Sequence, residues 1–430
     1  MFRLPRIFCE KGDFPEFLRV RWDEDTQTLS QKKSNPKRSL ELVPRLLGGG
    51  YDPESVDRRR TWVEEQAGFK VPLVGSHDFA GLSMQGNIEN LIGAAQIPLG
   101  IAGPLLIDGT DARGTFYVPM ATTEGALVRS YERGMATLTR AGGVKTRIHT
   151  DENRVSPVFL FDDIAAAADF AATLDEKLEP IRAEAESSTR HGKLLRLECH
   201  PIGRQVIVSF CFSTGDAHGM NMIVQATDRA CGWIMANTLA RHYHLFGGLE
   251  SEKRPTALLL LGGKGKKVTA GATISSKLLK MHLHVSPTEM TDLWHHGVLG
   301  NIQAGSVGHG GQLANGIAAI FIACGQDVAN VANSAVGITD FEITDKGALH
   351  VSVTMASITV ATVGGGTALG TGRECLGMLG CEGTGKARKL AEIVAATLLA
   401  GEISFAAAVA SGEFVAAHER YGRNRPGQST

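Results

Sequence analysis

One long stretch of this sequence carries almost no charge, and it limits the folds that can contain it. Beyond Lys389, the run to Val409 has only Glu392 and Glu402 as charged residues. A helix with this composition has no polar face to present to water, so it is expected inside a large domain or at an oligomer interface. A membrane span needs about 20 apolar residues, and the internal carboxylates favour a buried helix instead. Asn315–Ile322 has the same character.

The length of the chain predicts more than one domain. It has 430 residues, which exceeds what one ordinary core accommodates. We predict an α+β fold with a large mixed helix and sheet domain, formed by residues 89–154 and 256–430. A small domain, residues 155–245, is inserted into it. Residues 1–88 form an N-terminal segment that is partly helical.

The sequence pattern of the inserted block is typical of a small ferredoxin-like unit. Short apolar runs alternate with helical patterns in the order strand, helix, strand, strand, helix, strand. The expected elements are a strand at 155–161, an Ala-rich helix capped by Asp162 or Asp163, strands at 193–199 and 204–212, a helix at 217–239 and an apolar run at 257–261.

Two further helices have recognisable starts. Residues 52–66 are charged and have Pro53 near the beginning, a position that helices tolerate. Residues 123–137 follow Thr122 and Thr123, either of which can cap a helix. Residues 31–38 are basic and polar, which is typical of an exposed linker.

Charge and cysteine usage limit the partners and the compartment. The formal net charge is -1, so nothing attracts a nucleic acid globally and none is expected as a partner. The seven cysteines form no CxxC pair and mostly lie in apolar runs. Such cysteines are expected to be reduced, which is typical of a cytoplasmic protein. No apolar signal-peptide core follows Met1, and no membrane association is expected.

Four ionisable residues stand out because small or apolar residues surround each of them. Glu124 lies near a helix start; a buried carboxyl there can donate a proton, although local sequence alone favours a glutamate that only complements the helix dipole. Lys253 lies before an apolar run and can stabilise an oxyanion, or it belongs to a surface charge cluster. Asp327 follows an apolar helix at its unfavourable end, so a partner cation is expected. His418 follows another apolar helix, where a proton donor or an exposed histidine fits.

Glycine-rich segments indicate contacts with phosphates or a cofactor. Residues 216–222 precede a helix whose free N–H groups can hold a pyrophosphate, and residues 362–367 follow a β-rich run. Neither has the GxGxxG spacing of a Rossmann fold. Residues 262–267 are basic and could hold a CoA phosphate or form a plain turn. The paired histidines at 282, 284, 295 and 296 lack further ligands at metal spacing, so no metal is expected.

Several of these segments, in this order, resemble the hydroxymethylglutaryl-CoA (HMG-CoA) reductase family. The resemblance runs from about residue 87 to residue 422. Its motifs are Glu89–Gly93 with Pro98–Leu105, Pro119–Gly125, Gly215–Met222, Ala323–Asp327 and Thr362–Thr367. His218 stands where the family usually has methionine.

The resemblance implies the activity and the residues that carry it. The catalytic set falls on Glu124, Lys253, Asp327 and His418, with Lys253 on a catalytic loop at 246–255. The cofactor-binding positions are Arg190, Asp216, Gly219, Met220, Asn221, Gly364 and Gly365, and those for substrate and CoA are Arg133, Arg154, Arg254 and Asn315. The placement of the lysine resembles the class I branch, and Arg190 suits the 2′-phosphate of NADPH, with NADH as the alternative. The family's sites form between subunits, so a homodimer or larger homo-oligomer acting on an acyl-CoA is implied.

The departures from the family pattern lie on the substrate side. Phe246-Gly247-Gly248 replaces a usual Ser-Gly-Asn run, Glu252-Lys253-Arg254 replaces Asp-Lys-Lys, and Gly310-Gly311-Gln312 replaces Asn-Ala-His. Losing a polar contact to a substrate can shift specificity strongly. Reduction of HMG-CoA to mevalonate is the leading hypothesis. A paralogous reductase of another thioester and a non-catalytic acyl-CoA-binding protein are the alternatives.

Overall fold

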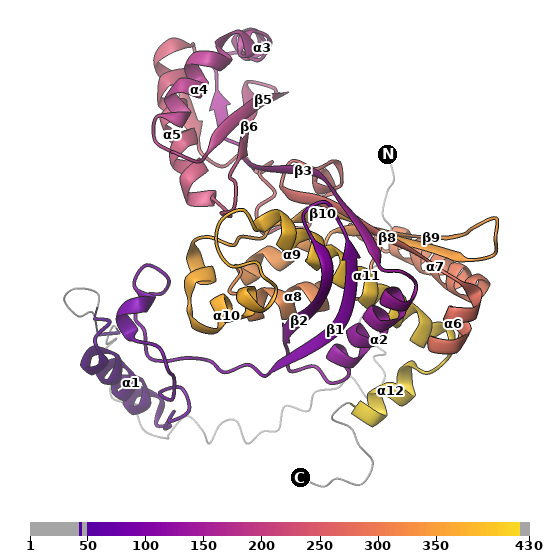
Figure 1. Cartoon of the computed structure of the whole chain (residues 1–430). Helices are drawn as coiled ribbons and strands as arrows, with labels where there is room; N and C mark the ends of the chain where they lie inside the picture. Colours follow the sequence, from indigo (N-terminus) through magenta and orange to yellow (C-terminus); the bar gives the residue numbers. More distant parts are fainter. Residues whose placement is uncertain (1–42, 45–49, 422–430) are drawn as a thin grey trace, which may run out of the picture.

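The computed structural model describes residues 43–44 and 50–421, and it covers the backbone of His418 and Tyr421 but not their side chains. The basic stretch at 31–38 and the first part of the predicted segment 1–88 lie outside the described residues. Figure 1 shows a large body, a smaller unit that projects from it, and the N-terminal helix on another side.

The large body is built on a mixed sheet with the strand order β2-β1-β3-β8-β10-β9. Neighbouring strands are antiparallel except β1 and β3, which are parallel. Alternate residues of β8 are buried, so one face of the sheet packs against helices. The strands are Leu99–Asp108 (β1), Arg113–Ala121 (β2), Val144–Val155 (β3), Gly265–Ile274 (β8), Gly337–Ile343 (β9) and Leu349–Ile358 (β10).

One helix forms the centre of this body. α11 contacts α2, α7, α8, β3, β8 and β10, and nearly all of its side chains are buried. It is long and apolar enough to cross a membrane by composition alone, but 83% of its apolar window is buried inside the protein. The prediction of a buried helix here is confirmed. The helices are Leu127–Arg140 (α2), Ser276–His282 (α6), Pro287–Gln303 (α7), Leu313–Ala323 (α8), Val331–Ser334 (α9), Gly370–Met378 (α10), Ala387–Ala410 (α11) and Phe414–Tyr421 (α12).

The two carboxylates of α11 are buried because main-chain donors satisfy them. Glu392 accepts hydrogen bonds from the backbone N–H groups of residues 110, 111 and 112 at 3.2, 2.9 and 2.7 Å. Glu402 accepts from those of Gly311 and Gln312 at 2.9 and 2.6 Å. A buried charge is tolerated when it is hydrogen-bonded in this way. Each glutamate therefore fixes a distant loop to the core helix.

The small unit has its own hydrophobic core and a β-α-β-β-α-β order. Its sheet runs β7-β4-β6-β5 with antiparallel neighbours, which is the ferredoxin-like arrangement. Its elements are Val158–Leu160 (β4), Ile164–Thr173 (α3), Leu178–Glu186 (α4), Lys193–Ile202 (β5), Gln205–Ser213 (β6), Met220–Asn237 (α5) and His242–His244 (β7). The expected strand at 257–261 is wrong: those residues form a 3₁₀ helix, and β7 is the fourth strand.

A single long strand joins the two units. β3 pairs with β8 over residues 145–152 and then with β6 over residues 153–155. The predicted strand at 155–161 is therefore divided, because β3 ends at Val155 and β4 begins only at Val158, beyond Pro157. Figure 1 shows β3 leading from the large body into the projecting unit. Residues at this crossing, Asn153 and Arg154, are buried between the units.

The N-terminal elements are a helix and a short 3₁₀ turn. α1 spans Pro53–Ala67, and Asp52 caps it by accepting from the N–H of Ser55 at 2.9 Å, which confirms the predicted start. The 3₁₀ turn spans Gly81–Met84. The predicted helix at 123–137 begins later, at Leu127, because Ala126 has a left-handed backbone with φ 70°.

The buried glutamates predict a specific stability defect. Glu392→Ala should lower the free energy of unfolding by about 3 kcal/mol or more, because it leaves three backbone donors without their acceptor. Urea denaturation followed by circular dichroism measures this change. Glu382→Ala is the matched control, since it removes only an exposed ion pair with Arg373 and should cost less than about 1 kcal/mol. Equal losses in the two variants would contradict the role given to Glu392.

Candidate active site

Lys253 and Asp327 form an ion pair in which Nζ and Oδ2 lie 2.9 Å apart. Asp327 follows α8, where the helix dipole disfavours a carboxylate, and Lys253 is the cation expected there. The side chains remain 45% and 42% exposed, so a ligand can reach both. The hydrogen bond that Lys253 donates to Asp327 raises the pKa of Lys253 and so favours its charged form. The pair offers an oriented positive charge to a developing oxyanion.

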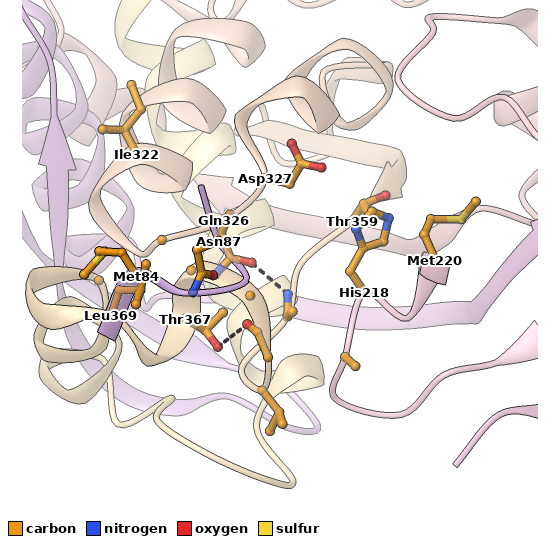
Figure 2. A pocket seen from close by; sticks show the side chains of 18 of the residues that line it. Met84, Asn87, His218, Met220, Ile322, Gln326, Asp327, Thr359, Thr367 and Leu369 are labelled. Carbon is orange, nitrogen blue, oxygen red and sulfur yellow. Dashed lines mark hydrogen bonds between the residues drawn. The ribbon is translucent and has the colours of Figure 1, made fainter. Parts of the chain in front are cut away.

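This ion pair borders a large pocket, a cavity of about 1440 Å³. Five segments line it: residues 78–97, residues 217–224, the loop that carries Phe246 and Lys253, the end of α8 with the turn that carries Asp327, and the region at 359–374. In Figure 2, Met84, Asn87 and Leu369 lie on one side, and His218 and Met220 lie on the other. A cavity of this size can hold a ligand larger than a single small metabolite.

Two glycine-rich turns shape the wall of this pocket. Gly219 has φ 76° and precedes Met220, the first residue of α5, whose N-terminus has no side-chain cap. The first N–H groups of α5 are therefore available to an anion. On the facing turn, Gly364 and Gly365 have φ 83° and 55°, values that favour glycine. Met220, Asn221, Gly364 and Gly365 all line the pocket.

The carboxylate of Asp216 does not line this pocket but binds main-chain N–H groups at the start of α11. It accepts hydrogen bonds from the N–H groups of Gly385, Lys386 and Ala387 at 2.6, 3.0 and 3.0 Å, at the start of α11. Burial raises the pKa of Asp216, but these three hydrogen bonds outweigh it and lower the pKa below its ordinary value. Its carbonyl accepts from the N–H of Thr362 at 2.9 Å. Asp216 thus joins both glycine-rich turns to the core helix.

Glu124 lies in a second, smaller pocket of about 480 Å³. Its two carboxylate oxygens lie 3.3 and 3.2 Å from Nδ2 of Asn315, which donates to them. Arg133 also lines this pocket, and its NH2 group donates to the Ser404 carbonyl at 2.6 Å. Phe414 and Ala417 of α12 complete the lining, so the helix that carries His418 borders the same pocket.

The two pockets share no lining residue, and α8 separates their polar groups. Asn315 lies in the first turn of α8, and Asp327 lies just beyond its end. At 1.5 Å per residue, an α-helix of this length extends for roughly 16 Å. One chain therefore brings Lys253 to Asp327 and Glu124 to Asn315 but keeps the two pairs apart.

The other predicted arginines differ in their accessibility. The Arg154 side chain is only 5% exposed; it donates to the Gly263 carbonyl at 2.8 Å and lies 3.6 Å from Glu198. Arg254 is exposed and lies 3.7 Å from Glu250. Arg190 is exposed on a turn whose Gly192 packs near Met222 of α5, beside the open N-terminus of that helix.

The basic segment at 262–267 is internal rather than a phosphate site. Lys264 is 1% exposed and is ion-paired with Glu252. Lys266 is 4% exposed and lies 3.0 Å from Asp151. Sequence reasoning noted His218 and Glu252 only as unusual residues, but the structure brings both to Lys264 beside Lys253. Spacing along the chain gave no signal for this cluster, because its members come from distant segments.

Comparisons of the sequence and of the fold with known proteins identify its relatives. The sequence matches the family model of hydroxymethylglutaryl-coenzyme A reductase over residues 55–423. The 3-hydroxy-3-methylglutaryl-coenzyme A reductase of Methanocaldococcus jannaschii is 38% identical, covering 89% of this chain and 99% of that protein. That of Pyrococcus horikoshii is 40% identical, covering 92% and 98%. A class II reductase from Streptococcus pneumoniae, solved with NADPH bound, shares the fold with a TM-score of 0.64 and 18% identity, covering 82% of this chain and 96% of that one.

These similarities identify the protein as an oxidoreductase. It belongs to the hydroxymethylglutaryl-coenzyme A reductase family.

The Lys253–Asp327 pair predicts how Lys253 titrates. Since Asp327 raises the pKa of Lys253, Asp327→Asn should let Lys253 lose its proton at lower pH. Amine-specific labelling at increasing pH, read by mass spectrometry, should modify Lys253 earlier in the variant than in the unaltered protein. Lys346, exposed between β9 and β10, should be labelled identically in both. An unchanged Lys253 profile would contradict the pairing.

Proposed function

We propose that the protein reduces HMG-CoA to mevalonate and free CoA in two steps with NADPH. The observation that carries this proposal is the Lys253–Asp327 pair, which opens into the same pocket as the uncapped N-terminus of α5. In a member of this family, that juxtaposition puts an oxyanion-stabilising charge beside a nucleotide-binding turn. A class I assignment and a cytoplasmic location remain predictions.

The residues of the larger pocket fit a nicotinamide cofactor. The free N–H groups of α5 suit a pyrophosphate, and the positive φ values of Gly219, Gly364 and Gly365 let the backbone approach it closely. Exposed Arg190 beside this helix suits a 2′-phosphate, which favours NADPH over NADH. When bound, NADPH would supply a hydride to the thioester carbonyl, and a second NADPH molecule would supply the hydride that reduces the aldehyde.

Three side chains carry out the remaining steps: one stabilises the oxyanion and two donate protons. Lys253, held charged by Asp327, stabilises the oxyanion that forms at the thioester carbonyl. His418 gives a proton to the CoA thiolate as the hemithioacetal collapses to the aldehyde. Glu124, oriented by Asn315, supplies the proton for the alcohol oxygen in the second reduction.

This division of labour requires two copies of the chain. The Lys253–Asp327 and Glu124–Asn315 pairs border different pockets, yet the mechanism needs both at one substrate. We infer a homodimer or a larger homo-oligomer in which one subunit supplies each pair. Exposed apolar side chains support such a contact: Leu99 and Ile101 on β1 and Tyr117 on β2 lie near the smaller pocket, whose lining includes Gly103 and Pro104 of β1.

The first experiment is an assay of NADPH oxidation by the purified protein with HMG-CoA, run in parallel with NADH. We expect two NADPH consumed per CoA released, slower turnover with NADH, and a loss of at least about 100-fold in Lys253→Ala. Release of CoA is followed separately with a thiol reagent. Absence of turnover while CoA is still bound would overturn the proposal.

A second substrate class has one observation in its favour. Phe246 lines the larger pocket and is 53% exposed, while Arg154 is committed to internal partners. Such a pocket favours an acyl thioester with an apolar distal end, since fewer cations remain for a distal carboxylate. Turnover of acyl-CoAs without that carboxylate, but not of HMG-CoA, would establish this alternative. Binding of CoA with no turnover of any thioester would identify a non-catalytic binding protein.

Shared active sites predict complementation between inactive variants. Glu124→Ala and Lys253→Ala should each be inactive alone. Mixed and reassembled in equal amounts, they should recover roughly a quarter of the wild-type activity, because half of the dimers then contain one intact site of two. Mixing Lys253→Ala with Asp327→Ala is the control and should recover nothing, since both changes fall in the same half-site. Equal recovery in the two mixtures would exclude sites shared in this way.

A further inference from the structure

The backbone around Lys253 is strained and needs to be held. Ser251 and Lys253 have φ values of 51° and 57°, the left-handed region that side chains other than glycine rarely adopt. Each such residue holds its backbone in a less favourable conformation than the right-handed region offers. Asp327 holds the Lys253 ammonium from one side. The residue between the two strained positions, Glu252, points inward and provides the second anchor.

Glu252 is anchored on a buried lysine. Its Oε2 pairs with Nζ of Lys264, a side chain that is nearly inaccessible to solvent. Nζ of Lys264 also donates to Oδ1 of Asn153 at 2.6 Å and lies 3.5 Å from Sδ of Met220. Burial raises the pKa of Glu252, but its interactions with His218 and Lys264 lower that pKa overall to about 2. The carboxylate is therefore charged at neutral pH.

His218 closes this network from the cofactor side. Its Nε2 lies 3.4 Å from Oε1 of Glu252. Both atoms are buried and make no hydrogen bond of ordinary geometry within the described residues, so the contact between them is a longer polar contact. The carbonyl of His218 accepts from Nδ2 of Asn153 at 2.9 Å, so His218, Glu252, Lys264 and Asn153 form a closed ring. The ring spans the turn before α5, the Lys253 loop, the start of β8 and the crossing point of β3.

We propose that His218 is a positioning residue that holds Glu252, and through it the strained backbone of Lys253, in register with the cofactor-binding turn. His218 also lines the pocket into which Asp327 points (Figure 2). The thioether of methionine, the usual family residue at this position, has no proton to donate to Oε1. Oε1 would then be buried without a partner. The inference rests on the proposed function, because it assigns His218 to the placement of the catalytic lysine.

The kinetic test compares His218→Met with His218→Gln. We expect His218→Met to lower kcat roughly 10- to 100-fold with KM for HMG-CoA and NADPH within about twofold, because a small displacement of a catalytic group slows the reaction more than it weakens binding. His218→Gln keeps an N–H donor and should restore most of the rate. His242→Met, an exposed histidine on β7, is the matched control and should leave kcat unchanged. An equal loss in the Met and Gln variants would overturn the proposal.

A double-mutant cycle tests whether His218 acts through Glu252. The combination of His218→Met with Glu252→Gln should be no slower than the slower single variant, since residues in one network are not additive. Multiplied losses would show that His218 acts independently and would overturn the proposal. Thermal unfolding of each variant separates a displaced lysine from a damaged fold.

Labelling of Lys253 distinguishes failure of this inference from failure of the proposed function. It needs no substrate, so it can be read even if HMG-CoA is not turned over. We expect the rate of amine-specific labelling at Lys253 to rise severalfold in His218→Met and to remain unchanged in His242→Met, because a displaced loop weakens the pairing with Asp327. An unchanged rate in His218→Met would overturn the positioning role, whatever the enzyme's substrate.

Discussion

The hydrogen bonds between carboxylates and main-chain N–H groups at α11 fix the turn that carries Asp216 and the loop before Asn315 to one helix. Asp216 caps the first turn of α11. Farther along the helix, Glu392 and Glu402 accept hydrogen bonds from backbone N–H groups of the loops at 110–112 and 311–312. Charge-assisted hydrogen bonds of this kind are strong, and inside a low-dielectric core they fix geometry tightly. Because α11 is itself buried on almost all sides, it cannot shift without disturbing the whole core. The cofactor-side turns and the loop before Asn315 are thus held in place by the same rigid helix.

That arrangement explains why the catalytic groups of one chain are separated. α8 packs against α11 and carries Asn315 at its start, while Asp327 follows its end. Two polar pairs fixed at opposite ends of a rigid helix cannot meet by side-chain rotation, since the intervening turns are buried. In the proposed oligomer, a second subunit lets one substrate contact both pairs. The small unit connects to the body through β3 and through the returning segment 245–264, and the hydrogen bonds that Asp216 accepts from residues 385–387 also fix its cofactor-side turn to α11.

Much of this fold follows from local sequence, and the failures have physical reasons. The buried character of α11 and the start of α1 near Pro53 were predictable because composition and the position of a proline are local features. A cation partner for Asp327 was predictable from the helix dipole, but its identity depended on the family resemblance. The apolar run at 257–261 suits a strand and a 3₁₀ helix equally, so only the competing pairing of β7 with β4 decides between them. The bonds of Asp216 to residues 385–387 and the internal role of Lys264 depend on contacts between distant segments, which no local pattern encodes.

The unusual residues around Lys253 make physical sense as a set. Glu252 is one methylene longer than the aspartate usual in the family, and it reaches both a buried lysine and a histidine at a position where methionine is usual. A buried lysine without a carboxylate, or a carboxylate with one oxygen unpaired, would each be costly, so either substitution is better tolerated when its partners are present. The carboxylate of Glu252 points inward, toward Lys264, whose ammonium also donates to Asn153. Phe246, on the same loop, contributes apolar surface to the pocket. Anchoring of the catalytic lysine and the polarity available to the substrate are therefore coupled through one loop, and a change in either is expected to alter the other.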